Sequence, residues 1–197
     1  MTDMLLNDVR LPDGAAVDVA ISRGRIERVG PNLQAPAHVA REAGAGLLLL
    51  PGLVEGHTHL DKTTWESPWY VNQVGPALTD RIDNERAWRA ASGHDAASHS
   101  RALALAFLRE GTTRIRSHVD VDTDAGLRHL EAVHATREAL AGLIEIQTVA
   151  FPQSGLLGRP GTAALLDLAL AQGADVLGGL DPCAIDRDPA QDRKSVV

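Results

Sequence analysis

The first fifty residues alternate between apolar and polar positions with a period of two, which is typical of short β-strands. Pro12-Asp13-Gly14 and Arg23-Gly24 are turn signals that separate these segments. The predicted strands are Met4–Leu11, Val17–Ser22 and Arg25–Val29, and the fully apolar segment Leu47–Leu50 belongs to the same unit. We therefore expect a small antiparallel β unit that cannot close its own sheet.

The period changes after residue 48, where strands begin to alternate with longer amphipathic segments. A buried strand over Leu49–Glu55 precedes a long loop rich in Trp, Pro, Asn and Gly. Three more strands are predicted at Arg114–Val119, Ile144–Phe151 and Ala174–Leu180, with helices at Asp95–Glu110, Asp124–Leu140 and Thr162–Ala171. Strands separated by helices form β–α–β units, so we expect a parallel sheet.

Two architectures fit this α/β pattern: an open doubly wound sheet, or half of an eight-stranded barrel. The loop after the first strand of the parallel sheet has no glycine-rich phosphate motif, which counts against a dinucleotide-binding fold. Polar residues recur at the carboxyl ends of the strands, where barrel enzymes carry their chemistry. We therefore favour the first half of a (β/α)8 barrel of the TIM type.

The composition narrows the class of protein. Of the 197 residues 44% are hydrophobic, which is enough for a sizeable core, and the net charge of -7 argues against a nucleic-acid or acidic-membrane partner. The single cysteine excludes an intramolecular disulfide and fits a reducing compartment. The N-terminus carries acids early, and the apolar run Leu47–Val54 is too short to span a bilayer. We expect a soluble, cytoplasmic protein.

The most specific chemical feature is His57-Thr58-His59, which follows an apolar strand in PGLVEGHTHLDKT. Side chains alternate across a strand, so His57 and His59 point to the same side, where two imidazoles can share one divalent ion. The alternative is a pair of structural histidines satisfied by hydrogen bonds. His118 and Asp120 repeat this spacing on the next strand, so geometry alone would also allow a four-ligand site.

Four segments in order resemble the amidohydrolase superfamily, in the branch of cytosine deaminase and N-isopropylammelide isopropylamidohydrolase. They are PGLVEGHTHLDK, GTTRIRSHVDVD, IEIQTVAFPQSG and GADVLGGLDP, and the similarity extends to about Asp188. The resemblance implies a barrel preceded by part of a small β-sandwich domain. We expect domain boundaries at residues 1–50 for the sandwich part and 51–191 for the half-barrel.

The resemblance also implies roles for particular residues. His57 and His59 match the first two metal ligands, and Gln153 matches the glutamine that hydrogen-bonds the amide-like edge of the substrate. A side-chain amide offers a donor and an acceptor, so it suits a pyrimidine or triazine ring. In the family the remaining ligands come from later strands, so His118 and Asp120 are expected to support neighbouring groups or the fold rather than bind the metal.

Other polar and aromatic residues have weaker assignments. Asp181 either contacts substrate or caps the following segment, and Trp69 either stacks on a ring or packs the loop onto the barrel. Lys62 is expected to be a loop ion-pair partner, and Cys183 a small buried residue rather than a nucleophile. The remaining histidines are expected to face solvent: His38, His94, His99, His129 and His134.

The implied cofactor is one divalent metal ion, Zn²⁺ or Fe²⁺, because the fourth strand of the half-barrel, ADVLGGLDPC, has no lysine to bridge a second metal. The implied reaction is hydrolytic removal of an amine from a small nitrogen heterocycle. Its catalytic glutamate, third histidine and ligand aspartate are expected after this strand, outside the chain. The alternatives are another cyclic amidohydrolase and a non-catalytic metal-binding half-barrel. Because family members are often oligomers, a full-length homo-oligomer is also expected.

The last six residues, Asp192–Val197, leave the family pattern. They can be back-translated as GATCGGAAGAGCGTCGTG, a common sequencing-adapter sequence, so we expect a non-native tail on a truncated gene. A half-barrel would leave an unpaired strand edge. We therefore expect the 197-residue polypeptide to be inactive and prone to aggregation.

Overall fold

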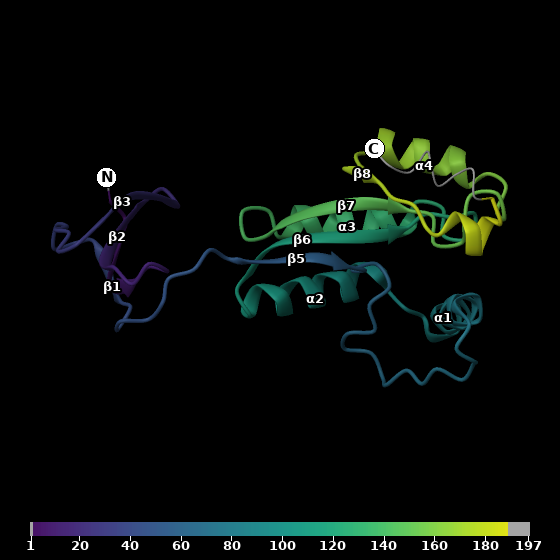
Figure 1. Cartoon of the computed structure of the whole chain (residues 1–197), viewed down its shortest axis with the longest axis horizontal. Helices are drawn as coiled ribbons and strands as arrows, with labels where there is room; N and C mark the ends of the chain where they lie inside the picture. Colours follow the sequence, from purple (N-terminus) through teal and green to yellow (C-terminus); the bar gives the residue numbers. More distant parts are fainter. Residues whose placement is uncertain (1, 189–197) are drawn as a thin grey trace. The chain divides into compact units, whose positions relative to one another are not determined.

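The computed structural model describes residues 2–188, and the chain divides into two compact units between Pro51 and Gly52 (Figure 1). The predicted tail at residues 192–197 lies outside the described residues. Among the helices of the described part, none combines the length and apolar content that a membrane crossing requires.

The first unit is a four-stranded sheet with the order β3-β2-β1-β4. Its strands are β1 (Met4–Arg10), β2 (Ala16–Ser22), β3 (Arg25–Gly30) and β4 (Ala40–Ala43). The first three pair antiparallel as predicted, whereas β4 pairs parallel to β1. The apolar segment at residues 47–50 is not a strand, and only Leu48 forms an isolated bridge. The sequence reading missed β4 because all four of its residues are exposed and it has no apolar alternation.

The second unit is a parallel sheet with the order β5-β6-β7-β8. Its strands are β5 (Leu53–Thr58), β6 (Thr112–Asp120), β7 (Glu145–Phe151) and β8 (Val176–Leu177). The helices are α1 (Leu78–Ser92), α2 (Ala96–Arg109), α3 (Arg128–Ala139) and α4 (Thr162–Ala171), followed by a π-helical turn, η1 (Pro182–Asp186). The predicted order of parallel strands and helices is therefore present.

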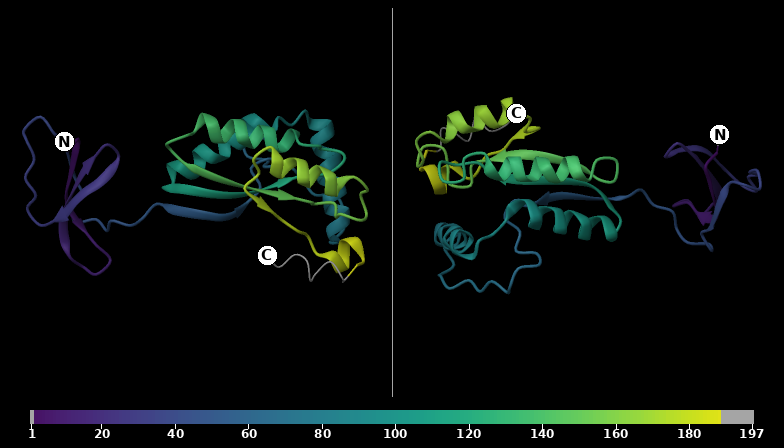
Figure 2. Two further views of the ribbon diagram at one scale, coloured as in Figure 1. Left: turned by 90° about the horizontal axis from the view of Figure 1, so that it is seen from above. Right: turned by 180° about the vertical axis from the view of Figure 1, so that it is seen from behind.

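The core of this unit lies on one face of the sheet, where α2 and α3 run along the strands (Figure 2). In β6, Ile115 and Val119 are buried in this core, while Arg114 and Arg116 alternate with them and are exposed. The arginines lie opposite polar residues of β7, because Arg114 pairs with Glu145 and Arg116 donates to Gln147. The period of two along β6 thus separates an apolar helix-covered face from a polar face.

Two parts of the second unit differ from the sequence-based prediction. The strand predicted as buried over residues 49–55 runs instead from Leu53 to Thr58, and Leu53 and Val54 are exposed. Within residues 2–188, β5 lies at the edge of the sheet and pairs with β6 alone. Helix α1 falls in the segment predicted as a loop. It is rich in charge and has no buried residue, so it lacks the apolar stripe by which helices are recognised.

Candidate metal and substrate site

Three histidines from neighbouring strands converge where β5 and β6 end. His57 lies in β5, His59 follows that strand, and His118 lies near the end of β6. The rings of His57 and His118 stack with their centroids 4.0 Å apart, and His59 lies 5.7 Å from His57 and 5.6 Å from His118. Phe151, at the end of β7, contacts the rings of both His59 and His118 edge-on. The neighbouring parallel strands β5, β6 and β7 therefore bring these side chains together at the carboxyl ends of the strands.

The surroundings of His59 keep its imidazole neutral. Burial, together with the nearby Lys62 cation, lowers the pKa of His59 to about 4, so the ring is neutral near pH 7. The buried Nδ1 of His59 has no hydrogen-bond partner among the described residues. It lies 3.9 Å from Oδ1 of Asp61 and 3.9 Å from Oδ1 of Asp120. Ligating histidines commonly turn one ring nitrogen toward a carboxylate and present the other to the metal. The neutral, partly buried His59 imidazole would therefore fit as a ligand to a divalent ion.

His118 is also held neutral. Burial lowers the pKa of His118, and the charges of His57 and Arg116 act in the same direction. Its Nδ1 is buried and unpartnered within the described part of the chain. A neutral ring stacked on His57 can support that ligand or stand beside it, so the geometry leaves both roles predicted for His118 open.

Asp61 fastens the loop after β5 to the rest of the sheet. Its fully buried carboxylate accepts the backbone N–H of Asp120 and pairs with His129 Nδ1, each at 3.0 Å. Burial by itself raises the pKa of Asp61, but the hydrogen bond and charge of His129, together with Lys62, outweigh it, so the pKa is lowered. The prediction that His129 faces solvent is wrong, because α3 directs this side chain toward Asp61.

Asp120 is surrounded by cations. Lys62 Nζ lies 3.2 Å from Asp120 Oδ1, and Arg89 Nη2 lies 3.6 Å from Oδ2. Burial and the charge of Asp61 nevertheless raise the pKa of Asp120 to about 6. Lys62 is an ion-pair partner, as predicted.

A second group of potential metal ligands overlaps this network. The ligand atoms of Asp61, Asp120 and His129 all lie within 4.8 Å of one another, which is close enough to hold an ion. Lys62 and Arg89 already neutralise Asp120, however, and they would repel a cation placed there. These two cations disfavour a metal ion at the carboxylates, and the neighbouring histidines are the other group of candidate ligands.

Lys62 also connects this network to Gln153, which follows β7. Its Nζ donates to Gln153 Oε1 at 3.1 Å and to Asp120 Oδ2 at 3.3 Å. Gln153, the residue predicted to bind substrate, is therefore linked to His59 by three contacts, through Lys62 and Asp120. Sequence reasoning did not find this link, since Lys62 and Gln153 lie 91 residues apart.

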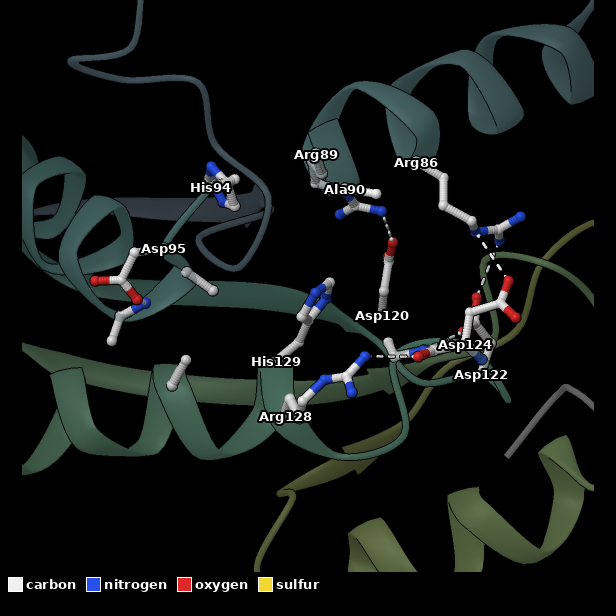
Figure 3. A pocket seen from close by; sticks show the side chains of 14 residues that line it. Arg86, Arg89, Ala90, His94, Asp95, Asp120, Asp122, Asp124, Arg128 and His129 are labelled. Atoms are coloured by element: carbon white, nitrogen blue, oxygen red, sulfur yellow. Dashed lines mark hydrogen bonds and ion pairs between the residues drawn. The ribbon is translucent and has the colours of Figure 1, made fainter. Parts of the chain in front are cut away.

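A pocket of about 400 Å³ lies beside the carboxylates, between α1 and the amino ends of α2 and α3 (Figure 3). Arg86 and Arg89 reach down from α1 to the acids at the end of β6, and Arg86 pairs with Asp122 at 3.0 Å. Asp122 also accepts backbone N–H groups of Asp124 and Ala125. The unpredicted helix α1 therefore supplies the cations that balance these buried acids.

Three further residues with predicted roles, Trp69, Asp181 and Cys183, are exposed or bonded to the backbone. The side chain of Trp69 is 91% exposed. Asp181 accepts the backbone N–H groups of Cys183 and Ala184, which is the capping alternative foreseen for it. Cys183 is exposed, so the prediction that it is buried is wrong.

His94 and His99 are only half-buried and stack on each other, so neither simply faces solvent. His134 is also half-buried, and its Nε2 lies 3.4 Å from Thr148 Oγ1. The prediction that these helix and loop histidines face solvent is therefore wrong for each of them, because each packs on a neighbouring residue.

Comparisons with known proteins add a family context, although no family model matches the chain. N-isopropylammelide isopropyl amidohydrolase of Pseudomonas sp. strain ADP is 30% identical over 191 residues, which are 91% of this chain and 46% of that protein. The crystal structure of N-isopropylammelide isopropylaminohydrolase from Burkholderia multivorans is 62% identical with a TM-score of 0.92, and the match covers 100% of this chain and 49% of that one.

A more distant solved structure, 5-methylcytosine deaminase of Klebsiella pneumoniae liganded with 5-fluorocytosine, is 32% identical with a TM-score of 0.70 over 89% of this chain and 43% of that one. The chain thus spans about half the length of the relatives it matches. The match to the Burkholderia structure confirms the predicted fold class, a β unit followed by the first part of a (β/α)8 barrel.

Proposed function

We propose a function on the premise that the chain belongs to the amidohydrolase superfamily, in its N-isopropylammelide hydrolase and cytosine deaminase branch, and corresponds to the N-terminal portion of its relatives. The proposed reaction is the hydrolysis of a C–N bond other than a peptide bond. It removes an amine or alkylamine from a ring carbon of a cytosine-like pyrimidine or a triazine.

One observation carries this proposal: the neutral imidazole of His59 lies beside His57 and turns its buried Nδ1 toward two carboxylates. His57 and His59 are the residues that would hold one divalent ion, zinc or iron. Such an ion, when bound, lowers the pKa of a coordinated water toward neutrality. The carboxylates of Asp61 and Asp120 lie 3.9 Å from Nδ1 of His59, so a small movement on metal binding would let them accept a hydrogen bond from this ring nitrogen.

The substrate is proposed to bind beside these histidines, at the carboxyl ends of the parallel strands. Gln153 would hydrogen-bond the heterocycle, and Phe151 would shield the histidines from water on the β7 side, because its ring packs on both His59 and His118. Trp69 and Asp181 stay predicted substrate contacts. Asp181 is the weaker of the two, since its carboxylate already accepts two backbone N–H groups.

The proposed catalytic glutamate, third histidine and aspartate are expected from the family resemblance at positions after the fourth strand of the half-barrel. A test of the whole activity therefore needs a chimera, in which residues 1–188 of this chain are continued by the C-terminal half of the Burkholderia relative. The 62% identity and the TM-score of 0.92 make this junction structurally conservative.

The experiment loads the chimera with zinc or iron and measures isopropylamine release from N-isopropylammelide and ammonia release from cytosine. We expect turnover of at least one substrate, and its loss in the His57→Ala, His59→Ala double variant. A folded, metal-loaded chimera that hydrolyses neither substrate would overturn the proposed reaction.

The sequence also allows two other functions. A chimera that opens a cyclic amide, while leaving exocyclic amines in place, would identify another cyclic amidohydrolase. A folded chimera that binds metal and hydrolyses neither kind of substrate would support the non-catalytic scaffold. A cytoplasmic location and a full-length homo-oligomer also stay proposals, the first from the single cysteine.

A further inference from the structure

Lys62 is held between two acceptors at the edge of the proposed site. Its side chain is only 10% exposed, and Nζ lies 3.2 Å from Asp120 Oδ1 and 3.1 Å from Gln153 Oε1. Asp120 is itself buried and paired with Arg89. Because the Asp120 carboxylate fixes the ammonium group, Lys62 presents a donor to Gln153 from a constant position.

This contact determines which way round the Gln153 amide lies. The two ends of a glutamine amide are nearly isosteric, and their assignment normally rests on the hydrogen-bond partners. A lysine ammonium has three donors and no acceptor, so the carbonyl oxygen of Gln153 must face it. The NH₂ group then points away from Lys62, and no hydrogen-bond partner for it is seen among residues 2–188.

We propose that Lys62 is a specificity-determining residue: it holds the carbonyl oxygen of Gln153, so that the amide turns its N–H donors toward the substrate. Gln153 then selects a ring edge that carries an acceptor, such as a carbonyl oxygen or an unprotonated ring nitrogen, over an edge that carries an amino group. This rests on the proposed function, and it narrows the sequence-based expectation that the amide offers both a donor and an acceptor.

The charge pattern around Lys62 supports the assignment. The buried Asp120 would lose one of its two cations if Lys62 turned away, whereas Gln153 has no charge with which to displace it. Rotation of the Gln153 amide by 180° would bring its NH₂ against the ammonium and leave two donors facing each other. The orientation of the amide is therefore set by Asp120 through Lys62.

The experiment compares two triazines in the chimera. One is N-isopropylammelide, with two ring oxo groups; the other has one of those oxo groups replaced by an amino group. We expect the parent chimera to prefer the dioxo ring, and Lys62→Met to reduce this preference in kcat/KM about tenfold, chiefly through KM, because the freed amide can rotate to accept from the amino group. Lys62→Arg, which also only donates, is expected to retain most of the preference.

Arg89→Met is the matched control, since it removes a cation from Asp120 without touching Gln153. Arg89→Met is expected to change kcat/KM for the two triazines by the same factor and therefore to leave their ratio unchanged. A Lys62→Met variant that keeps the parent ratio, or an Arg89→Met variant that loses it equally, would overturn the inference. A parent chimera that hydrolyses neither triazine, nor cytosine, would contradict the proposed function instead.

Discussion

The carboxylate of Asp61 lies 3.0 Å from the backbone nitrogen of Asp120, and this hydrogen bond joins the loop after β5 to the end of β6. The same oxygen pairs with His129 Nδ1 on α3, so three elements meet at one fully buried acid. His59 precedes Asp61 by two residues, so this anchor holds the segment of chain that carries the histidine. The proposed metal site therefore depends on a residue that need not touch the metal.

Replacing Asp61 with alanine is expected to lower the free energy of unfolding of the chimera by about 3 kcal/mol, because the substitution leaves a buried N–H and a partly buried imidazole without their acceptor. Denaturant unfolding measures this effect. Asp124→Ala is the comparison, since Asp124 is half exposed and pairs with arginines near the surface, where such pairs contribute less than about 1 kcal/mol. Equal losses in the two variants would show that Asp61 is not a buried anchor.

Metal content distinguishes the histidine cluster from the overlapping carboxylate group. We expect His59→Ala to abolish stoichiometric zinc binding by the chimera, and His129→Ala to retain the metal with lower protein stability. Elemental analysis after dialysis against metal-free buffer measures both. The reverse pattern, with metal lost from His129→Ala and kept by His59→Ala, would assign the ion to Asp61, Asp120 and His129.

How far the sequence predicts this site follows from the range of each interaction. The spacing of His57 and His59 predicts a shared side from the period of a single strand, and the helix predicted at residues 162–171 matches α4 (Thr162–Ala171), because its boundary signals are local. The contact between Asp61 and His129 spans 68 residues, and no local pattern encodes it. Asp61 does continue the two-residue spacing of His57 and His59. This spacing is the one feature of the sequence that could have indicated a role for Asp61 beside the two histidines.

Helix α1 shows a second limit of the sequence pattern. None of its residues is buried, and Arg86 and Arg89 form ion pairs with acids that come from β6 and the following loop. Hydrophobic periodicity cannot predict an element that is held by ion pairs. Asp120 is compensated by Arg89 and Lys62, and Asp61 by the hydrogen bond and ion pair with His129.

Acid stability is expected to depend on Asp122. Burial favours its neutral form, but the N–H groups of Ala125 and Asp124, the Ser154 hydroxyl and the Arg86 cation outweigh burial and lower its pKa below the ordinary value of 3.8. Since the folded pKa is lowered, this carboxylate stabilises the fold fully above about pH 4, and the contribution is lost as the pH falls through the folded pKa. Melting temperatures between pH 6 and pH 3 should fall less steeply in Asp122→Asn, and parallel curves would contradict this prediction.

Gly178 tests whether the wall of the site is closely packed. A β-carbon at this position would lie 2.8 Å from Val149 Cγ1 and 3.1 Å from Phe151 Cδ2, so Gly178→Ala should push on the ring that packs against His59 and His118. Overpacking of this kind costs about 1–3 kcal/mol, which denaturant unfolding of the chimera measures. Gly56→Ala is the control in β5, where an added β-carbon meets nothing within 4 Å. Because the added methyl group would push on Phe151, Gly178→Ala should also weaken metal binding. A variant that is as stable as the parent and binds the metal as tightly would show that Phe151 can move without cost.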